Sequence, residues 1–223
     1  LTAPAAIRLV SNFVNSGTFN AGAGVVYFQS NTTVSGASTT AFNRVEIGGI
    51  LRAHTNAMAI TGAWTNNGTF AHNGGTVEFN GTTIISGTRT SSFNNVLING
   101  SLVGHISLPV IIAGGWTNNG SFDHNSGVIV LTNSTAVGGS SVTVFNDLTI
   151  NGTLIGAADT MRVAGNWVNN GVFDHNDGTV VFNGNTTVSG TKSNSFNHLT
   201  IWGLFTAPTS SLYVAGNWVN DGT

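Results

Sequence analysis

The chain has 223 residues, of which 40% are hydrophobic and only 6% are charged, whereas about 25% are charged in an average soluble domain. This apolar content is sufficient for a packed core, so the many Asn, Ser, Thr and Gly residues do not indicate disorder. The net charge of −2 leaves no basic surface for nucleic acid, and the lack of cysteine excludes disulfides and thiolate metal sites. No apolar run approaches the roughly 20 residues of a membrane span, so we expect no membrane insertion.

An internal repeat of about 51 residues runs along the chain. In each copy an aromatic residue heads a segment of the type W-[TV]-N-[ND]-G, and these residues are spaced by 51, 52, 51 and 51 positions: Phe13, Trp64, Trp116, Trp167 and Trp218. A Phe-Asn pair keeps the same register and begins at Phe42, Phe93, Phe145 and Phe196. No boundary interrupts this register, so we expect residues 1–223 to form a single repetitive domain.

Each repeat reads as several short strands bounded by Asn-Gly turns, and no segment shows helical periodicity with caps. In the best-preserved copy the strands are expected at Met161–Ala164, Thr179–Phe182, Thr186–Ser189 and His198–Trp202. The turns Asn169-Asn170-Gly171 and Asn183-Gly184 supply residues that tolerate positive φ. The sequence therefore predicts an all-β fold.

The fold class expected from this pattern is a right-handed parallel β-helix, or β-solenoid, with two coils per repeat. A β-propeller with one large blade per repeat is the alternative. We favour the solenoid because equivalent residues would stack in successive turns, where like charges repel and Asn, Ser and Thr form hydrogen-bonded ladders. Two coils per repeat would make a rod of roughly 40 Å from the strand spacing.

The two ends of the chain suggest end-to-end contacts. Leu1-Thr2-Ala3-Pro4 resembles Phe205-Thr206-Ala207-Pro208, and the overhang Leu212–Thr223 opens a further copy of the repeat. Neither end has the polar character of a capping repeat. We expect a segment of a longer array or a polymerising subunit, with adjoining repeats or copies of itself as partners, and candidate assembly residues at Leu212, Val214 and Trp218. Trp202 joins these candidates because it departs from the repeat, where Gly48, Asn99 and Asn151 stand.

The tightest polar cluster is Phe173-Asp174-His175-Asn176-Asp177-Gly178. Oxygen atoms of Asp174, Asn176 and Asp177 make this segment the one candidate for Ca²⁺. Earlier copies of the cluster lose one or both acids and keep His-Asn, as a turn requires. The histidines of the three copies, His72, His124 and His175, would lie roughly 10 Å apart and too far from one another to share Zn²⁺. We therefore expect a turn, no other metal and no cofactor.

The remaining residues with chemical potential also have structural interpretations. The tryptophans of the repeat would either plug the core, which we favour, or form a row that stacks against glycans. The eight acidic residues mostly follow the repeat, whereas a glycosidase needs one pair of carboxyls roughly 5 to 10 Å apart. The sequence gives no catalytic residue, and we expect that the chain is not an enzyme.

Two stretches resemble the Asn/Gly/Thr-rich β-helical repeats of large secreted bacterial surface proteins of the filamentous-haemagglutinin-like adhesin or fibre type. They are the segment from Val163 to Gly171 and the segment from Ser195 to Ile201. The resemblance implies an extracellular or cell-surface location and a structural role in a fibre, stalk or adhesin that assembles head-to-tail. A glycan-binding surface module is the alternative, and a polysaccharide-degrading β-helix enzyme is a more distant one.

Overall fold

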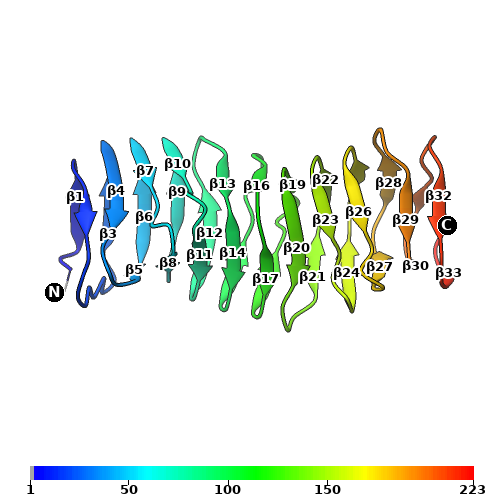
Figure 1. The fold of residues 1–223 in the computed structure, drawn as a ribbon, viewed down its shortest axis with the longest axis horizontal. Helices are drawn as coiled ribbons and strands as arrows, with labels where there is room; N and C mark the ends of the chain where they lie inside the picture. The colour runs from blue at the N-terminus through cyan, green and yellow to red at the C-terminus, as the bar shows by residue number, and fades with distance from the viewer. Residues whose placement is uncertain (1–2) are drawn as a thin grey trace.

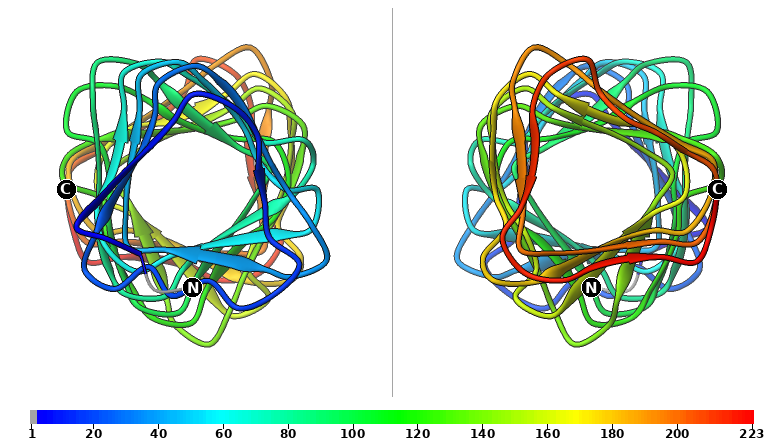
Figure 2. Two further views of the ribbon diagram at one scale, coloured as in Figure 1. Left: turned by 90° about the vertical axis from the view of Figure 1, so that its left-hand side faces the viewer. Right: turned by 90° about the vertical axis from the view of Figure 1, so that its right-hand side faces the viewer.

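The computed structural model describes residues 3–223, which form 33 short β-strands and no helix. The strands wind into a straight rod with the N-terminal and C-terminal ends of the chain at its opposite ends (Figure 1). Viewed along the rod, the coils surround one common axis, and each is a rounded triangle that is turned relative to distant coils (Figure 2). All strand pairs are parallel, so the fold is a β-solenoid, and the propeller alternative is wrong.

The rod has three faces, and each face is a stack of parallel strands that breaks once into two sheets. The first face contains a seven-stranded and a five-stranded sheet: β1 (Ala6–Leu9), β3 (Val25–Phe28), β6 (Arg44–Ile47), β9 (Trp64–Asn66), β12 (Thr82–Ser86), β15 (Ser101–Val103) and β18 (Ser121–Asp123), then β21 (Thr143–Phe145), β24 (Thr160–Val163), β27 (Thr179–Phe182), β30 (His198–Ile201) and β33 (Trp218–Asn220).

The second face contains a four-stranded and a seven-stranded sheet: β2 (Phe13–Val14), β4 (Asn31–Ser35), β7 (Ile50–Arg52) and β10 (Thr69–Ala71), then β13 (Ser91–Phe93), β16 (Val110–Ile112), β19 (Val128–Leu131), β22 (Asp147–Ile150), β25 (Trp167–Asn169), β28 (Thr186–Ser189) and β31 (Phe205–Thr206). The third face contains an eight-stranded and a two-stranded sheet: β5 (Thr40–Phe42), β8 (Ala57–Ile60), β11 (Thr76–Phe79), β14 (Asn95–Ile98), β17 (Trp116–Asn118), β20 (Ser134–Gly138), β23 (Thr153–Ile155) and β26 (Val172–Asp174), then β29 (Asn194–Phe196) and β32 (Leu212–Val214).

One coil is shorter than half a repeat. Paired residues in successive coils are 18 to 21 positions apart, as in Thr40 with Met58, Ala6 with Val25 and Trp64 with Ile85. One repeat spans eight strands, from β9 to β17, and one coil uses three, so each repeat makes two and two-thirds turns. The expectation of two coils per repeat is therefore wrong, because strands of three to five residues with tight turns close a coil in fewer residues than 25.

This turn number also changes the length of the rod. The seven and five strands of the first face form twelve rungs, which give a length of about 50 Å at the usual strand spacing, longer than the 40 Å expected. It also rotates each repeat by one face: Trp64 lies on the first face, Trp116 on the third and Trp167 on the second. Equivalent residues of consecutive repeats therefore do not stack, and the expected stacking of His72, His124 and His175 is wrong.

The core is filled by one aromatic cluster per repeat. In the second repeat the ring centroids of Trp64, Phe70 and Phe93 lie 4.7 to 5.5 Å apart in edge-on and tilted arrangements, which are the geometries that aromatic pairs prefer. The other repeats build the same cluster from Phe13, Phe19 and Phe42, from Trp116, Phe122 and Phe145, and from Trp167, Phe173 and Phe196. The prediction that the tryptophans of the repeat plug the core is confirmed for Trp64, Trp116 and Trp167, which are fully buried, whereas Trp218 is 48% exposed.

Candidate functional site

The segment W-[TV]-N-[ND]-G is used by the fold itself. The buried tryptophan donates its indole N–H to a polar side chain 27 residues later, as Trp64 does to Ser91 Oγ at 2.9 Å. The later repeats keep this contact with a changed acceptor, in the pairs Trp116 with Thr143 and Trp167 with Asn194. A buried indole N–H requires such a partner, so Ser91, Thr143 and Asn194 have a structural explanation.

The first asparagine of the segment is also buried and joins three parts of the chain. Asn66 donates from Nδ2 to the carbonyl of Thr90 at 2.9 Å, and its Oδ1 accepts the amide N–H of Gly68. Its own carbonyl accepts the amide N–H of Arg89. The same set of contacts recurs around Asn118 and Asn169. These bonds bridge the place in each repeat where the sheet of one face breaks, so this asparagine has a structural role.

Asn-Gly pairs lie at the corners of the rod, and at the corner between the third and first faces the predicted Asn ladder is found. Asn99 donates from Nδ2 to Oδ1 of Asn80 at 2.8 Å, and Asn119 donates to Asn99 at 3.2 Å. These three residues come from different positions of the repeat, because a coil is 19 to 20 residues long here. The glycines that follow them stack so closely that a Cβ on Gly120 would lie 2.0 Å from the carbonyl oxygen of Gly100.

Trp202 stands at the corner between the first and second faces, at the position that Asn99 holds in its own repeat. Its side chain is 47% exposed, and the guanidinium of Arg162 lies 5.0 Å from the ring centroid. Arg162 Nε and Asn183 Oδ1 are buried and have no hydrogen-bond partner among the described residues. Arg162 is the cation that stacks on Trp202, and Asn183 lies beside Trp202 in the preceding coil. Asn183 corresponds to Asn80 of the second repeat. The side-chain oxygen of Asn80 accepts a hydrogen bond from Asn99, and Trp202 stands at the position of Asn99. Trp202 is thus an exposed aromatic residue placed against a cation, and its proposed role in assembly stays a prediction.

The three calcium candidates lie in a tight turn after β26. Asp174 Oδ1 accepts the amide N–H of Asn176, while Asn176 Nδ2 donates to the carbonyl of Gly156 in the preceding coil. Asn176 and Asp177 adopt left-handed backbone conformations, with φ of 49° and 57°. The matching turn at Asp123 and Asn125 makes the same two bonds. The turn accounts for Asp174 and Asn176, and the binding of Ca²⁺ stays a prediction.

The other assembly candidates lie on the last two strands. Leu212 and Val214 on β32 are half-buried and pack against the core, and Trp218 on β33 is 48% exposed. β33 pairs with β30 along one edge, and no described strand pairs with its second edge. These residues therefore lie together at one end of the rod, whereas Trp202 lies on its side.

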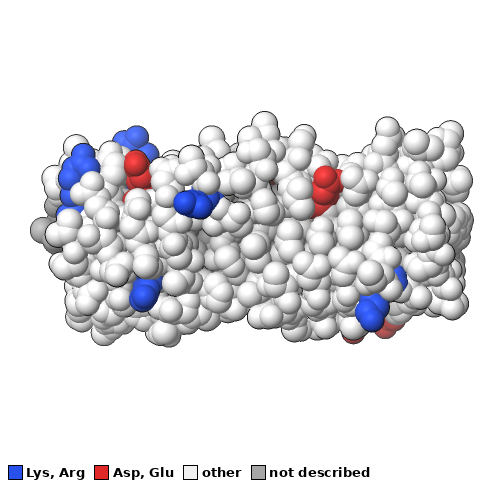
Figure 3. Space-filling view, turned by 90° about the horizontal axis from the view of Figure 1, so that it is seen from above, with Lys and Arg blue, Asp and Glu red and all other residues white. Residues whose placement is uncertain are grey.

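Charged groups are sparse and dispersed over the rod surface (Figure 3). The described residues contain no group of three or more His, Asp or Glu side chains that could hold a metal ion. Among residues 3–223 the one approach between basic and acidic side chains within 4 Å is that of His175 Nδ1 to Asp177 Oδ1 at 3.7 Å. No helix of a length and apolarity suited to crossing a membrane occurs in the part of the chain that the structure describes.

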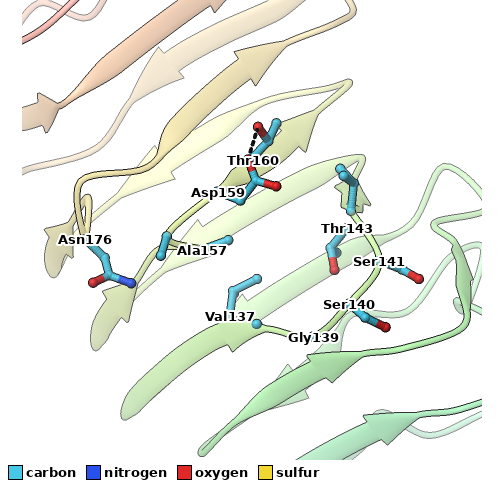
Figure 4. A pocket seen from close by; sticks show the side chains of 12 residues that line it. Val137, Gly139, Ser140, Ser141, Thr143, Ala157, Asp159, Thr160 and Asn176 are labelled. Atoms are coloured by element: carbon cyan, nitrogen blue, oxygen red, sulfur yellow. Dashed lines mark hydrogen bonds between the residues drawn. The ribbon is translucent and has the colours of Figure 1, made fainter.

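A cavity of about 400 Å³, which the sequence interpretation missed, opens beside Ala157. Its wall comprises the loop from Gly138 to Val142, the segment from Ala157 to Thr160, and Asn176 of the next coil (Figure 4). We call this cavity the Ala157 hollow. The sequence does carry a sign of it: the residues aligned with Ala157 in the first two repeats are His54 and His105.

Comparisons of the chain with known protein families, with curated proteins and with solved structures give no match.

Proposed function

We propose that this chain is a rigid structural segment of an extracellular fibre, stalk or adhesin. The observation that carries the proposal is the use of the repeated residues. The tryptophan and phenylalanines of the inner repeats pack together in the interior, and the first asparagine is buried and hydrogen-bonded to backbone groups, so the repeat maintains a continuous rod. This proposal assigns no enzymatic activity to the chain.

The construction of the rod supports a mechanical role. Backbone hydrogen bonds run along its axis on three faces, and the aromatic clusters continue from coil to coil. Stability in such an array is close to a sum over neighbouring repeats, so length can be added without a new core. A surface with few charges and many amide and hydroxyl groups is also compatible with close contact to polysaccharide or to other rods.

The test of this proposal is location and shape together. Antibodies against the rod, applied to intact producing cells, are expected to label the cell surface or fibres, and electron microscopy of the labelled material should show rods of uniform width. Labelling that appears only after lysis would contradict an extracellular structural role. The control is a cytoplasmic marker, which must stay unlabelled on the intact cells.

End-to-end contact belongs to the same proposal. The open edge of β33 and the half-exposed side chain of Trp218 fit a further coil of this repeat, which an adjoining repeat or a second copy would supply. A heterologous contact of this kind produces filaments. Sedimentation of the chain with Trp218→Ser should show less self-association than wild type, and Trp202→Asn tests in the same assay whether the side of the rod contributes to assembly. Equal self-association of all three proteins contradicts this joint.

Glycan binding is a second candidate function, and the observation that favours it is the exposed indole of Trp202 beside Arg162. An aromatic face and a guanidinium are suited to stack on a sugar ring and to bond its hydroxyl groups. The buried tryptophans of the repeat do not contribute to such a site. A glycan array probed with wild type and with Trp202→Asn separates the two candidates, because binding that survives the substitution excludes Trp202 as the recognition residue.

A further inference from the structure

One position in the repeat is occupied by histidine twice and then by smaller residues. This position follows β7, β15, β23 and β31, where the residues are His54, His105, Ala157 and Pro208. A loop that contains a glycine with positive φ lies 18 residues earlier in the chain, one coil below this position. These glycines are Gly36, Gly87, Gly139 and Gly190. The first three copies form a series in which the surroundings are conserved while the imidazole is present or absent.

The two histidines define what fits beside this loop. His54 donates from Nε2 to the carbonyl oxygen of Gly36 at 2.8 Å, and its Nδ1 accepts the amide N–H of Asn56 at 2.9 Å. His105 repeats the first contact with Gly87 at 3.0 Å. Its Nδ1 accepts the amide of Leu108 at 2.9 Å. In both rings Nε2 donates and Nδ1 accepts, which is the hydrogen-bonding pattern of an imidazole that carries its N–H on Nε2.

The Ala157 hollow is the same place without the ring. The groups that correspond to the histidine partners are the carbonyl of Gly139 and the amide of Asp159, and no hydrogen bond of either group is found within residues 3–223. Gly139 is exposed, whereas Gly36 and Gly87 are half-covered. In Figure 4, Ala157 and Gly139 border the hollow and Asp159 lies at its rim. A methyl group at residue 157 thus leaves a backbone acceptor and a backbone donor without a protein partner among the described residues, at the exposed edge of the hollow.

We propose that the Ala157 hollow binds an imidazole ring supplied from outside this chain. The ring would donate one N–H to the carbonyl of Gly139 and accept the amide N–H of Asp159, which are the two bonds that His54 makes in its own repeat. The apolar edge of the ring would contact Val137 and Ala157, both of which line the hollow. Backbone groups that lack a partner favour a ligand that satisfies both of them over one that only fills the volume.

The source of the ring is either a small nitrogen heterocycle or a histidine side chain of a partner polypeptide. The volume of the hollow exceeds that of a single imidazole ring, and Ala158 at its rim is exposed where Ile106 projects in the second repeat. A histidine on a protruding loop would therefore reach the two backbone groups without displacing the wall. Comparing free imidazole with the N-acetyl, N-methylamide derivative of histidine distinguishes the two sources, since the derivative carries peptide groups that reach past the rim.

The experiment is a titration of the folded chain with imidazole, followed by the amide resonances of Asp159 and Gly139. At pH 8 a ring with a pKa near about 6.5 is neutral, as the two bonds require. We expect saturable shifts at these two residues, with a dissociation constant in roughly the millimolar range for so small a ligand. Furan, which has the shape but no N–H, and N-methylimidazole, which lacks the donor, should bind at least tenfold more weakly. A tighter constant for the histidine derivative indicates a polypeptide partner, and a weaker one a free heterocycle.

Two substitutions make the assignment specific. Ala157→His should supply the ring internally, weaken imidazole binding at least tenfold and reproduce the contacts of His54. Ala157→Leu fills the same volume without nitrogen atoms and should also abolish binding, so the test does not depend on the folding of one variant. His54→Ala should create a second hollow, with new saturable shifts at Asn56.

Absence of saturable shifts at Asp159 and Gly139 in wild type overturns the proposal. So does equal binding of furan and imidazole, or unchanged binding in a folded Ala157→His or Ala157→Leu protein.

Discussion

The interior of the rod and its Asn-Gly corner follow different periods. Inside, Trp64 and Ser91 belong to one repeat and are 27 residues apart, so the contact returns at the same spacing in the next repeat, with Thr143 as the acceptor. At the corner, Asn80 and Asn99 are 19 residues apart, and the coils bring non-equivalent positions of the repeat together. The interior is therefore one set of contacts that recurs in every repeat. The corner instead brings together residues from different positions of the repeat, and single positions there are free to change. The sequence repeat of this solenoid records interior contacts and not the stacking of its coils.

The largest expected effect is the loss of an interior tryptophan. Trp116→Ala removes a fully buried ring from the cluster with Phe122 and Phe145, and we expect a loss of about 3–5 kcal/mol in the free energy of unfolding. Trp116→Phe keeps most of the packing but leaves Thr143 Oγ1 without its N–H donor, at a cost of about 1–3 kcal/mol. Urea denaturation measures both values. Costs below 1 kcal/mol for both would show that the interior is no more constrained than the corner.

Most of the fold is predictable from the sequence, because alternation and Asn-Gly turns are local properties. The expected strands Thr179–Phe182 and Thr186–Ser189 are confirmed residue for residue, and those at Met161–Ala164 and His198–Trp202 end one residue earlier than expected. Three-residue strands such as Asn194–Phe196 were missed because a buried asparagine interrupts their apolar pattern.

The number of coils per repeat was not accessible in the same way. A period of 51 residues is compatible with several numbers of coils per repeat, and strand pairings such as that of Trp64 with Ile85 are needed to reveal the length of the coil. The Ala157 hollow shares this difficulty. The change from histidine to alanine is visible in the sequence, but its meaning depends on contacts of His54 with a loop 18 residues away.

The next largest effect on stability is expected at the stacked glycines, which are the corner residues least able to accept a larger side chain. Gly120→Ala places a Cβ 2.0 Å from the carbonyl oxygen of Gly100, and relief of this overlap requires the two coils to separate. We expect a loss of about 1–3 kcal/mol in the free energy of unfolding. Gly138→Ala is the matched control, since nothing lies within 4 Å of its Cβ, and its free energy should change by less than about 0.5 kcal/mol. Equal effects of the two changes would contradict close stacking at the corner.

A buried hydroxyl group offers a change that should stabilise the interior. Thr83 is fully buried, and its Oγ1 has no hydrogen-bond partner among the described residues. Thr83→Val removes this unsatisfied group at nearly constant shape, and we expect a gain of about 1 kcal/mol in the free energy of unfolding. Thr82→Val, on the exposed side of the same strand, should change it by less than about 0.5 kcal/mol. A loss of stability in Thr83→Val would mean that the hydroxyl is bonded in solution.

The smallest effect on stability is expected from a substitution that replaces a corner residue of one repeat with its counterpart from another repeat. Trp202→Asn restores the residue that Asn99 represents, and its amide should donate to Asn183 Oδ1 as Asn99 does to Asn80. That bond contributes about 0.5–1.5 kcal/mol, while the lost stacking of Arg162 costs about 0.5–1 kcal/mol. The net change in stability should therefore stay within about 1 kcal/mol.

A double-mutant cycle with Arg162→Met isolates the stacking energy between Arg162 and Trp202. We expect a coupling of about 0.5–1 kcal/mol, measured by urea denaturation of the two single variants and the double variant. A coupling indistinguishable from zero would show that the guanidinium gains nothing from the ring in this rod. Trp202 would then be held by neither the ladder nor the cation, and its side chain would be free to contact a partner molecule at little cost to the fold.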